Sequence, residues 1–238
     1  MLRKVKDRLR RIKWLLRSAL GRDLFYSPQI TVEVEVIGGS PATGSGAWPV
    51  HVASLGPESV VYAVGIGDDI SFDLALIERF QLHVHAFDPT PTSLRWLEKQ
   101  NVPDLFVAYP YGLANYDGQA TFHAPANPAH VSYSMSHKDG NLAETVDVEV
   151  RRLGSLMEML GHSHIDVLKM DIEGGEYDVI SDVLNSGIEV HQILVEFHHR
   201  MSGIEMAQTK QAVTELNAAG YKIAYVSAIG EEYLFLKS

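Results

Sequence analysis

The feature that most constrains the fold is a regular alternation of strand-like and helix-like segments that begins at Ser59. Short runs rich in Val, Ile, Tyr and Phe alternate with longer segments whose apolar residues recur every three or four positions. This alternation is typical of a parallel sheet with helices on both faces. The predicted strands cover residues 59–65, 82–88, 105–113, 165–172, 192–198, 221–228 and 232–238, and the predicted helices cover residues 69–80, 91–100, 176–187 and 206–220. We therefore predict an α/β fold with three layers.

The two ends of this pattern differ from its centre. The last two predicted strands are joined by a few residues that include Gly230, so we expect them to form an antiparallel hairpin at the end of a mostly parallel sheet. In the middle, residues 119–124 and 145–153 predict strands of an insertion or hairpin, and residues 155–161 predict a short helix.

The first 20 residues predict a basic amphipathic helix. One helical face collects apolar residues: Leu2, Val5, Leu9, Ile12, Leu16 and Ala19. The segment has eight Lys or Arg and one Asp, a charge of +7, which leaves −17 for the rest of a chain whose total is −10. The helix either lies on an anionic membrane surface with Trp14 at the interface, or packs on the protein body or a second subunit. A mitochondrial import segment is a third interpretation, weakened by the presence of only one serine.

Composition limits the domain organisation and the function. Residues 38–50 are rich in glycine, so we expect residues 1–50 to hold the helix and a lead-in segment and residues 51–238 to form the main domain. The chain has no cysteine, which excludes disulfides, thiolate nucleophiles and Cys-type zinc sites. The charge of −10 argues against a nucleic-acid partner. Because no apolar run reaches the roughly 18 residues of a membrane span, we expect a soluble, cytoplasmic protein with membrane contact limited to residues 1–20.

The turn after the first predicted strand, VGIGDD, is the first candidate binding site, because ligands of open α/β sheets bind outside the carboxyl ends of the strands. Gly65 and Gly67 allow a ligand to approach the backbone closely, although any tight turn favours such glycines. Ile70 replaces the third glycine of the dinucleotide fingerprint, and Asp68 and Asp69 would repel a pyrophosphate. The turn therefore favours a cationic ligand over NAD.

Asp88 ends the second predicted strand, 21 residues beyond Gly67. This is the spacing at which an acid binds the two hydroxyls of a ribose. An alternative is that Asp88 caps the helix that begins near Pro91, and one carboxylate can serve both purposes.

The stretch KMDIEGGEY ends a buried strand in acidic residues. Because side chains alternate along an extended strand, Lys169, Asp171 and Glu173 should point to one side, at the ligand-binding edge of the sheet. Glu176 needs no functional explanation, because negative charge is favourable at the positive N-terminal end of the next helix. The same effect explains Glu173 in part. A lysine in a central strand needs a partner, so we expect a Lys169–Asp171 ion pair that keeps Asp171 ionised.

His198 reaches the same edge from the next strand. It shares a face with Glu196, whereas His199 lies on the opposite face. Its ordinary pKa, about 6.5, suits a group that accepts a proton from a hydroxyl near neutral pH. A purely structural histidine is the alternative.

Five stretches resemble the FkbM-type family of S-adenosylmethionine-dependent methyltransferases: VVYAVGIGDDISFD, VHAFDPTP, YGLANYDGQATFH, IDVLKMDIEGGEYDVI and ILVEFHH. KMDIEGGEYDVI is the most specific of them, and the resemblance covers well over half of the chain. It implies a class I methyltransferase (Rossmann-like) fold, in which a C-terminal antiparallel hairpin completes the sheet. It also implies S-adenosyl-L-methionine as the cofactor and a small-molecule acceptor, a hydroxyl of a sugar, polyketide or related metabolite.

The resemblance also assigns residues to the cofactor. It places Gly65 and Gly67 against the methionine part, Asp88 on the ribose, and Gly112 and Leu113 near the adenine. The chain departs from the family pattern two residues before the first glycine, where Ala63 replaces the usual acid. Asp68 or Asp69 would then supply the charge that holds the amino group of the cofactor.

Methyl transfer from a sulfonium needs an aligned hydroxyl and a base. We expect His198 or Asp171 to be that base and Glu173 to position the acceptor. We expect no metal; a magnesium ion held by Asp171 and Glu173 is the alternative.

Residues 123–145 are expected to form the acceptor pocket, with His130, Tyr133 and His137 either lining it or exposed on its surface. Two other functions stay open: a nucleotide-dependent reductase on the same sheet, and a non-catalytic module that binds membranes.

Overall fold

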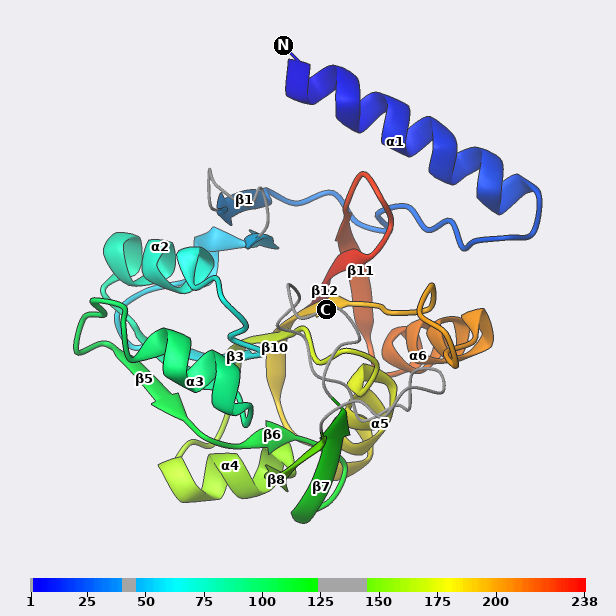
Figure 1. Cartoon of the computed structure of the whole chain (residues 1–238). Coiled ribbons are helices and arrows are strands. Elements are labelled where there is room, and N and C mark those ends of the chain that lie inside the picture. Colours follow the sequence, from blue (N-terminus) through cyan, green and yellow to red (C-terminus); the bar gives the residue numbers. More distant parts are fainter. Residues whose placement is uncertain (1, 40–45, 124–144) are drawn as a thin grey trace.

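The computed structural model describes residues 2–39, 46–123 and 145–238. Its centre is a seven-stranded sheet (Figure 1). In spatial order the strands are β11 (Tyr221–Val226), β12 (Glu232–Lys237), β10 (Val190–Glu196), β9 (Ile165–Met170), β3 (Val60–Val64), β4 (His83–Phe87) and β5 (Phe106–Tyr109). Each strand lies within a segment for which the sequence predicted one, except that β10 begins two residues earlier.

The sheet is mostly parallel and ends in the expected antiparallel hairpin. Strands β10, β9, β3, β4 and β5 run parallel to one another, and β12 runs antiparallel to both β10 and β11. Strand β12 therefore lies between β10 and β11 instead of extending the edge. Strand order reverses at the β3–β9 pair, since β4 and β5 continue on one side and β10 on the other.

Helices cover both faces of the sheet, which confirms the predicted three-layer architecture. On one face lie α4 (Leu153–Leu160), α5 (Glu176–Ser186) and α6 (Met206–Ala218), and on the other lie α2 (Ser71–Phe80) and α3 (Pro91–Leu97). Successive residues of a strand pack into opposite layers. In β3, Tyr62 and Val64 belong to the first core, whereas Val61 and Ala63 belong to the second.

A hairpin of β1 (Glu35–Gly38) and β2 (Ala47–Val50) completes the second layer and is followed by a 3₁₀ turn (Val52–Ser54). Trp48 and Val50 are buried in the same core as α2. In the alternating apolar and polar stretch of residues 30–37, only the last three residues belong to a strand, β1, and part of the glycine-rich segment is also a strand. The domain boundary at residue 50 stays a prediction.

The insertion predicted in the middle of the chain is a small sheet. Strand β7 (Gly118–His123) pairs antiparallel with β8 (Thr145–Arg151), and β6 (Gly112–Leu113) pairs parallel with β8. The predicted acceptor-pocket residues His130, Tyr133 and His137 lie outside the described residues.

The predicted N-terminal helix is α1 (Leu2–Ala19), and it packs on the body through Trp14. The indole is buried, its Nε1 donates a hydrogen bond to the carbonyl of Leu24, and it lies so close to Gly230 that a Cβ atom there would overlap the ring. None of the helices in the described part of the chain is long and apolar enough to cross a membrane.

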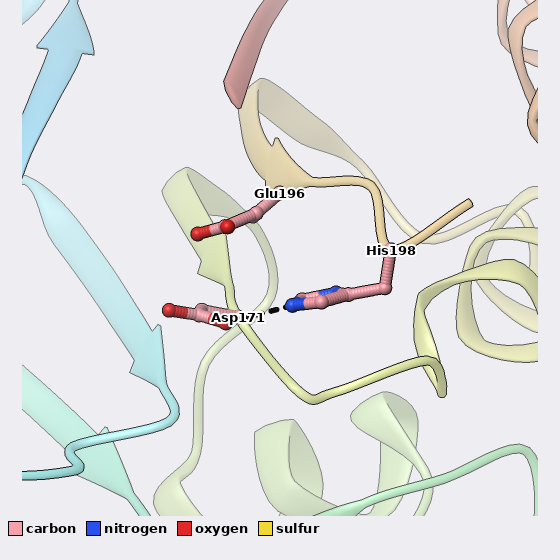
Figure 2. Close-up of side chains that lie close together, drawn as sticks. All are labelled: Asp171, Glu196 and His198. Atoms are coloured by element: carbon pink, nitrogen blue, oxygen red, sulfur yellow. Dashed lines mark ion pairs between the residues drawn. The ribbon is translucent and has the colours of Figure 1, made fainter. Parts of the chain in front are cut away.

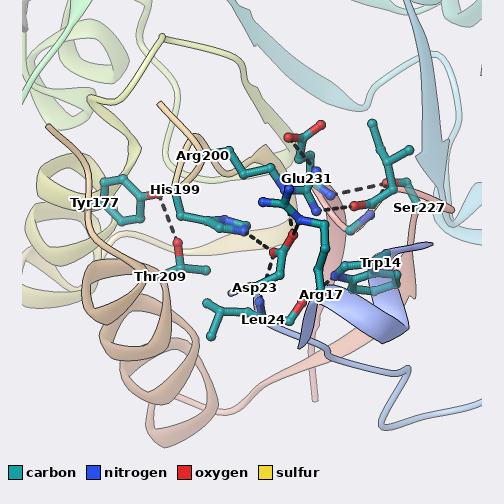
Figure 3. A network of polar contacts seen from close by, with 12 residues as sticks. Trp14, Arg17, Asp23, Leu24, Tyr177, His199, Arg200, Thr209, Ser227 and Glu231 are labelled. Carbon is teal, nitrogen blue, oxygen red and sulfur yellow. Dashed lines mark hydrogen bonds and ion pairs between the residues drawn. The ribbon is translucent and has the colours of Figure 1, made fainter. Parts of the chain in front are cut away.

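A buried carboxylate, Asp23, fixes the end of α1 (Figure 3). Arg17 of α1, and His199 and Arg200 from the loop after β10, all bond to it at 2.9–3.0 Å. Burial raises the pKa of Asp23, but the bonds from His199 and Arg200 outweigh this effect and lower it. Arg200 also pairs with Glu231 in the β11–β12 loop, so α1 is tied to two loops of the main sheet.

Candidate active site

A cleft of about 920 Å³ opens at the carboxyl ends of the central strands, where strand order reverses. It is lined by the turns after β3 and β9, the end of β10, the β1–β2 hairpin and Arg10 of α1. The predicted site residues that line it are Gly65, Gly67, Asp68, Asp88, Gly112, Leu113, Lys169, Asp171 and Glu173. The remaining predicted residue, His198, lies behind Asp171.

Gly65 is required where β3 and β9 approach each other. Its φ is +88°, and a Cβ atom on it would overlap the carbonyl oxygen of Asp171. The carbonyl of Gly65 also accepts a hydrogen bond of 2.7 Å from Lys169 Nζ. The glycine turn and the acidic turn are therefore held together directly.

Asp88 is buried and accepts four hydrogen bonds from its own chain. One oxygen accepts the backbone N–H groups of Ile66 and Gly67, and the other accepts the N–H and hydroxyl of Thr90. It thus holds the glycine turn and Thr90, which is itself the N-cap residue of α3, so Asp88 supports the start of the helix without capping it. Binding of a ribose by Asp88 stays a prediction. The ribose hydroxyls would have to donate to this carboxylate together with the four present donors, or in place of some of them.

The expected ion pair between Lys169 and Asp171 is absent from the described residues. Lys169 Nζ donates to the Gly65 carbonyl instead and lies 5.1 Å from the ring centre of Trp48. Burial raises the pKa of Asp171, although the charges of Lys169 and His198 oppose the rise. The expectation that a lysine contact fixes the ionised form was wrong, because burial outweighs a charge that is not in contact.

The acidic turn is less extended than expected. Strand β9 ends at Met170, and Glu173 has a φ of 53°, so strict alternation stops before it. Glu176 is fully buried and accepts the backbone N–H groups of Ile172 and Gly174 at 3.0 Å. Its role in the turn is structural, as predicted.

His198 is held between three carboxylates (Figure 2 shows Asp171). Its Nδ1 lies 2.9 Å from Glu176, and its Nε2 lies 3.6 Å from Asp171 and 3.9 Å from Glu173. Burial disfavours the charged ring, but the hydrogen bond to Glu176 and the three negative charges raise the pKa of His198 to about 10. The ring is thus protonated at neutral pH, which corrects the expectation that it is poised to accept a proton there.

Glu196 lies beside Asp171 at the neighbouring strand end, and both side chains point the same way (Figure 2). Burial and the charge of Asp171 raise the pKa of Glu196 to about 8. The sequence placed Glu196 on the face of His198 but assigned it no role. Its position at the end of β10, beside β9, was the available signal.

Asp73 is a cleft residue that the sequence did not indicate. It is buried in α2, its Oδ1 has no hydrogen-bond partner, and burial raises its pKa to about 6 against the charge of Lys169. An acid in the first turn of a helix is ordinary, so its sequence position carries no signal. By contrast, Asp68 is exposed, and Asp69 accepts the N–H of Ser71 at the start of α2.

One group of possible metal ligands occurs among the described residues. Asp171, Glu196 and His198 each offer a ligand atom, and these atoms lie within 4.8 Å of one another. Glu173, expected to share a magnesium ion with Asp171, does not belong to this group.

The strand order, with antiparallel β12 between β10 and β11 and a cleft at the switch point, defines a class I methyltransferase fold. Residues 61–223 match the family described as Methyltransferase FkbM domain, and the chain belongs to this family. The resemblance found in the sequence is thereby confirmed.

The relatives match only part of their length. "Probable methyltransferase-like protein 24" of Homo sapiens is 27% identical over 156 residues, 64% of this chain and 36% of that protein. "Hexuronic acid methyltransferase AglP" of Haloferax volcanii is 23% identical over 157 residues, 62% of each. The chain thus spans about a third of the first relative and less than two thirds of the second. A fibrillarin pre-rRNA processing protein of Methanococcus jannaschii is similar with a TM-score of 0.47 and 11% identity, covering 78% of this chain and 69% of that one.

Proposed function

We propose that this protein transfers a methyl group from S-adenosylmethionine to a hydroxyl oxygen of a sugar or related small metabolite. The observation that carries the proposal is the set of carboxylates around one cleft: Asp73, Asp171, Glu173 and Glu196. Such a lining attracts a sulfonium and repels a dinucleotide phosphate. The named substrate class of the Haloferax volcanii relative supports a sugar acceptor.

The cleft residues fit the cofactor. At Gly65 the backbone leaves no room for a side chain, which brings main-chain atoms to the cleft surface. The unpartnered Oδ1 of Asp73 is a site for the ammonium of the methionine part and makes up for the acid missing at Ala63. The buried pair Gly112 and Leu113 offers an apolar surface for the adenine.

The bound cofactor supplies a methyl group already activated by the positive sulfur. The chain must hold the acceptor hydroxyl in line and remove its proton. We assign the base to Asp171, because burial raises its pKa and strengthens it as a base, while the charged ring of His198, 3.6 Å away, favours its ionised form. Burial raises the pKa of Glu196 as well, so these two neighbouring acids share a proton near neutral pH. Glu173 lines the same cleft and is assigned to positioning the acceptor.

Ligand binding tests the cofactor assignment. Titration calorimetry with S-adenosylhomocysteine and with NAD, on the same preparation, should give heat of binding for the first compound alone. Binding of NAD without binding of S-adenosylhomocysteine would overturn the proposal in favour of a reductase.

The chemical role of Asp171 needs a separate measurement. Methyl transfer from labelled S-adenosylmethionine to a panel of uronic acids and neutral glycosides should fall by about 10²-fold or more in Asp171→Asn. The matched control is Asp178→Asn, an exposed acid in α5. Equal rates for the two variants would remove Asp171 from the mechanism.

A further inference from the structure

Helix α1 presents two different faces. The face that carries Trp14 packs against the body, as described above, and Arg10 on this face lines the cleft. Residues Ile12 and Leu16 are each two positions from Trp14, about 200° around the helix axis. They therefore point away from the protein.

The outward face is apolar and uncovered. Its large side chains and their exposed fractions are Leu9 at 62%, Ile12 at 46%, Leu16 at 61% and, just beyond the helix, Leu20 at 69%. Single exposed apolar residues are ordinary, but four at i, i+3, i+7 and i+11 form one continuous stripe. We call these four residues the leucine stripe.

Positive charge borders the leucine stripe. Arg11 and Lys13 are exposed, and the first 20 residues carry +7 in a chain whose total is −10. The rest of the molecule is thus strongly acidic and is repelled by an anionic surface. Attraction to such a surface is confined to α1, which fixes the side of the molecule that approaches it.

The position of α1 on the body is fixed as well. The ion pairs and hydrogen bonds of Asp23, with the seating of Trp14 against Gly230, hold its C-terminal half to loops of the main sheet (Figure 3). The leucine stripe therefore has one orientation relative to the cleft.

We propose that α1 docks this protein on an anionic lipid surface, with the leucine stripe among the acyl chains and the basic residues at the phosphates. Basic helices with one apolar face bind in this way, parallel to the membrane plane. Because Arg10 lines the cleft, docking places the cleft mouth within about one helix diameter, roughly 10–12 Å, of the lipid.

A second copy of the chain is a poorer partner for the leucine stripe. Outside residues 9–25, the large apolar side chains exposed in the described parts are Val32, Val36, Tyr116 and Met159, and none is part of a comparable row. Pairing of two α1 helices along their stripes would bring two segments of +7 together.

Vesicle flotation of the full chain tests the proposal. Wild type should float with vesicles of phosphatidylcholine and phosphatidylglycerol, much less with phosphatidylcholine alone, and less at about 0.5 M salt. The double variant Ile12→Glu/Leu16→Glu should bind anionic vesicles at least about tenfold more weakly. The control is Met159→Glu, an exposed apolar residue of α4, which should float like wild type.

Two further measurements keep the result unambiguous. Thermal unfolding and S-adenosylhomocysteine binding should be the same in the double variant and in wild type, so lost flotation does not reflect lost folding or a failed cofactor assignment. Light scattering after gel filtration should give the same mass for both. Flotation of the double variant equal to wild type, or a wild-type dimer that the double variant dissociates, would overturn the proposal.

Discussion

The Nδ1 atom of His198 lies 2.9 Å from Oε1 of Glu176, and the same carboxylate accepts the backbone N–H groups of the acidic turn. Because Glu176 is fully buried, its charge depends on these donors. His198 thus supports the turn that carries Asp171 and at the same time faces Asp171 with its other ring nitrogen. The His198 ring therefore connects the buried Glu176, which holds the turn, to Asp171, the proposed base.

The raised pKa of His198 predicts a pH-dependent stability. The ordinary pKa is 6.5 and the folded value is about 10, so the folded state holds the proton more tightly. The stabilisation is fully present below pH 6.5 and is lost as pH rises toward 10, by at most about 1.4 kcal/mol per pH unit. Urea unfolding of wild type and His198→Gln across this range should show a shrinking difference in unfolding free energy. A constant difference would mean that the ring is neutral in the folded protein.

Asp73 is expected to bind the cofactor amino group. Asp73→Asn keeps the shape but removes the charge, and it should weaken S-adenosylhomocysteine binding by about tenfold or more in calorimetry. The control is Asp68→Asn, which also lines the cleft but is exposed, and which should change affinity by less than about threefold. Equal effects of the two substitutions would show that the cleft needs only general negative charge.

Gly65→Ala tests the close approach of β3 and β9. The alanine would have to adopt a φ of +88° and would overlap the Asp171 carbonyl, so unfolding should become easier by about 3 kcal/mol or more. Gly161→Ala is the matched control, because Gly161 has a φ of +74° with no neighbour within 4 Å of a Cβ atom. It should cost about 1 kcal/mol, the conformational part alone. Chemical denaturation of both variants gives the comparison, and similar losses would argue against the overlap.

Methyl transfer should not require a divalent metal. The sulfonium methyl is already activated, so its transfer needs no Lewis acid, and Nε2 of His198 already lies 3.6 Å from Asp171. Dialysis against EDTA should leave the rate unchanged. If activity is lost and returns with Mg²⁺ or Mn²⁺, then Asp171, Glu196 and His198 act as metal ligands instead.

Much of the fold could be predicted because local pattern and tertiary structure agree. The buried runs that became β3, β4, β9 and β10 are long enough and apolar enough to be strands in any context. The insertion of β12 between β10 and β11 is different. Sequence shows that two strands form a hairpin, but which of them pairs with the sheet depends on contacts between residues distant in the chain.

The site was predictable to the extent that strand ends meet at one edge. This rule correctly brought Asp171 and His198 together. It could not reveal that Lys169 bonds to a backbone carbonyl, since every residue has one. Nor could it separate Asp73 from an ordinary helix-start acid, because its burial depends on the cleft walls that other segments supply.

The place of β12 has a consequence for synthesis on the ribosome. Strand β11 emerges first, yet in the described sheet it pairs with β12 alone, so it waits as an open edge until residues 232–237 have been translated. Leu234 and Phe235 are then completely enclosed between the two helix layers. A premature stop before β12 would leave β11 without a strand partner and remove these two side chains from the core, so such a product is expected to aggregate.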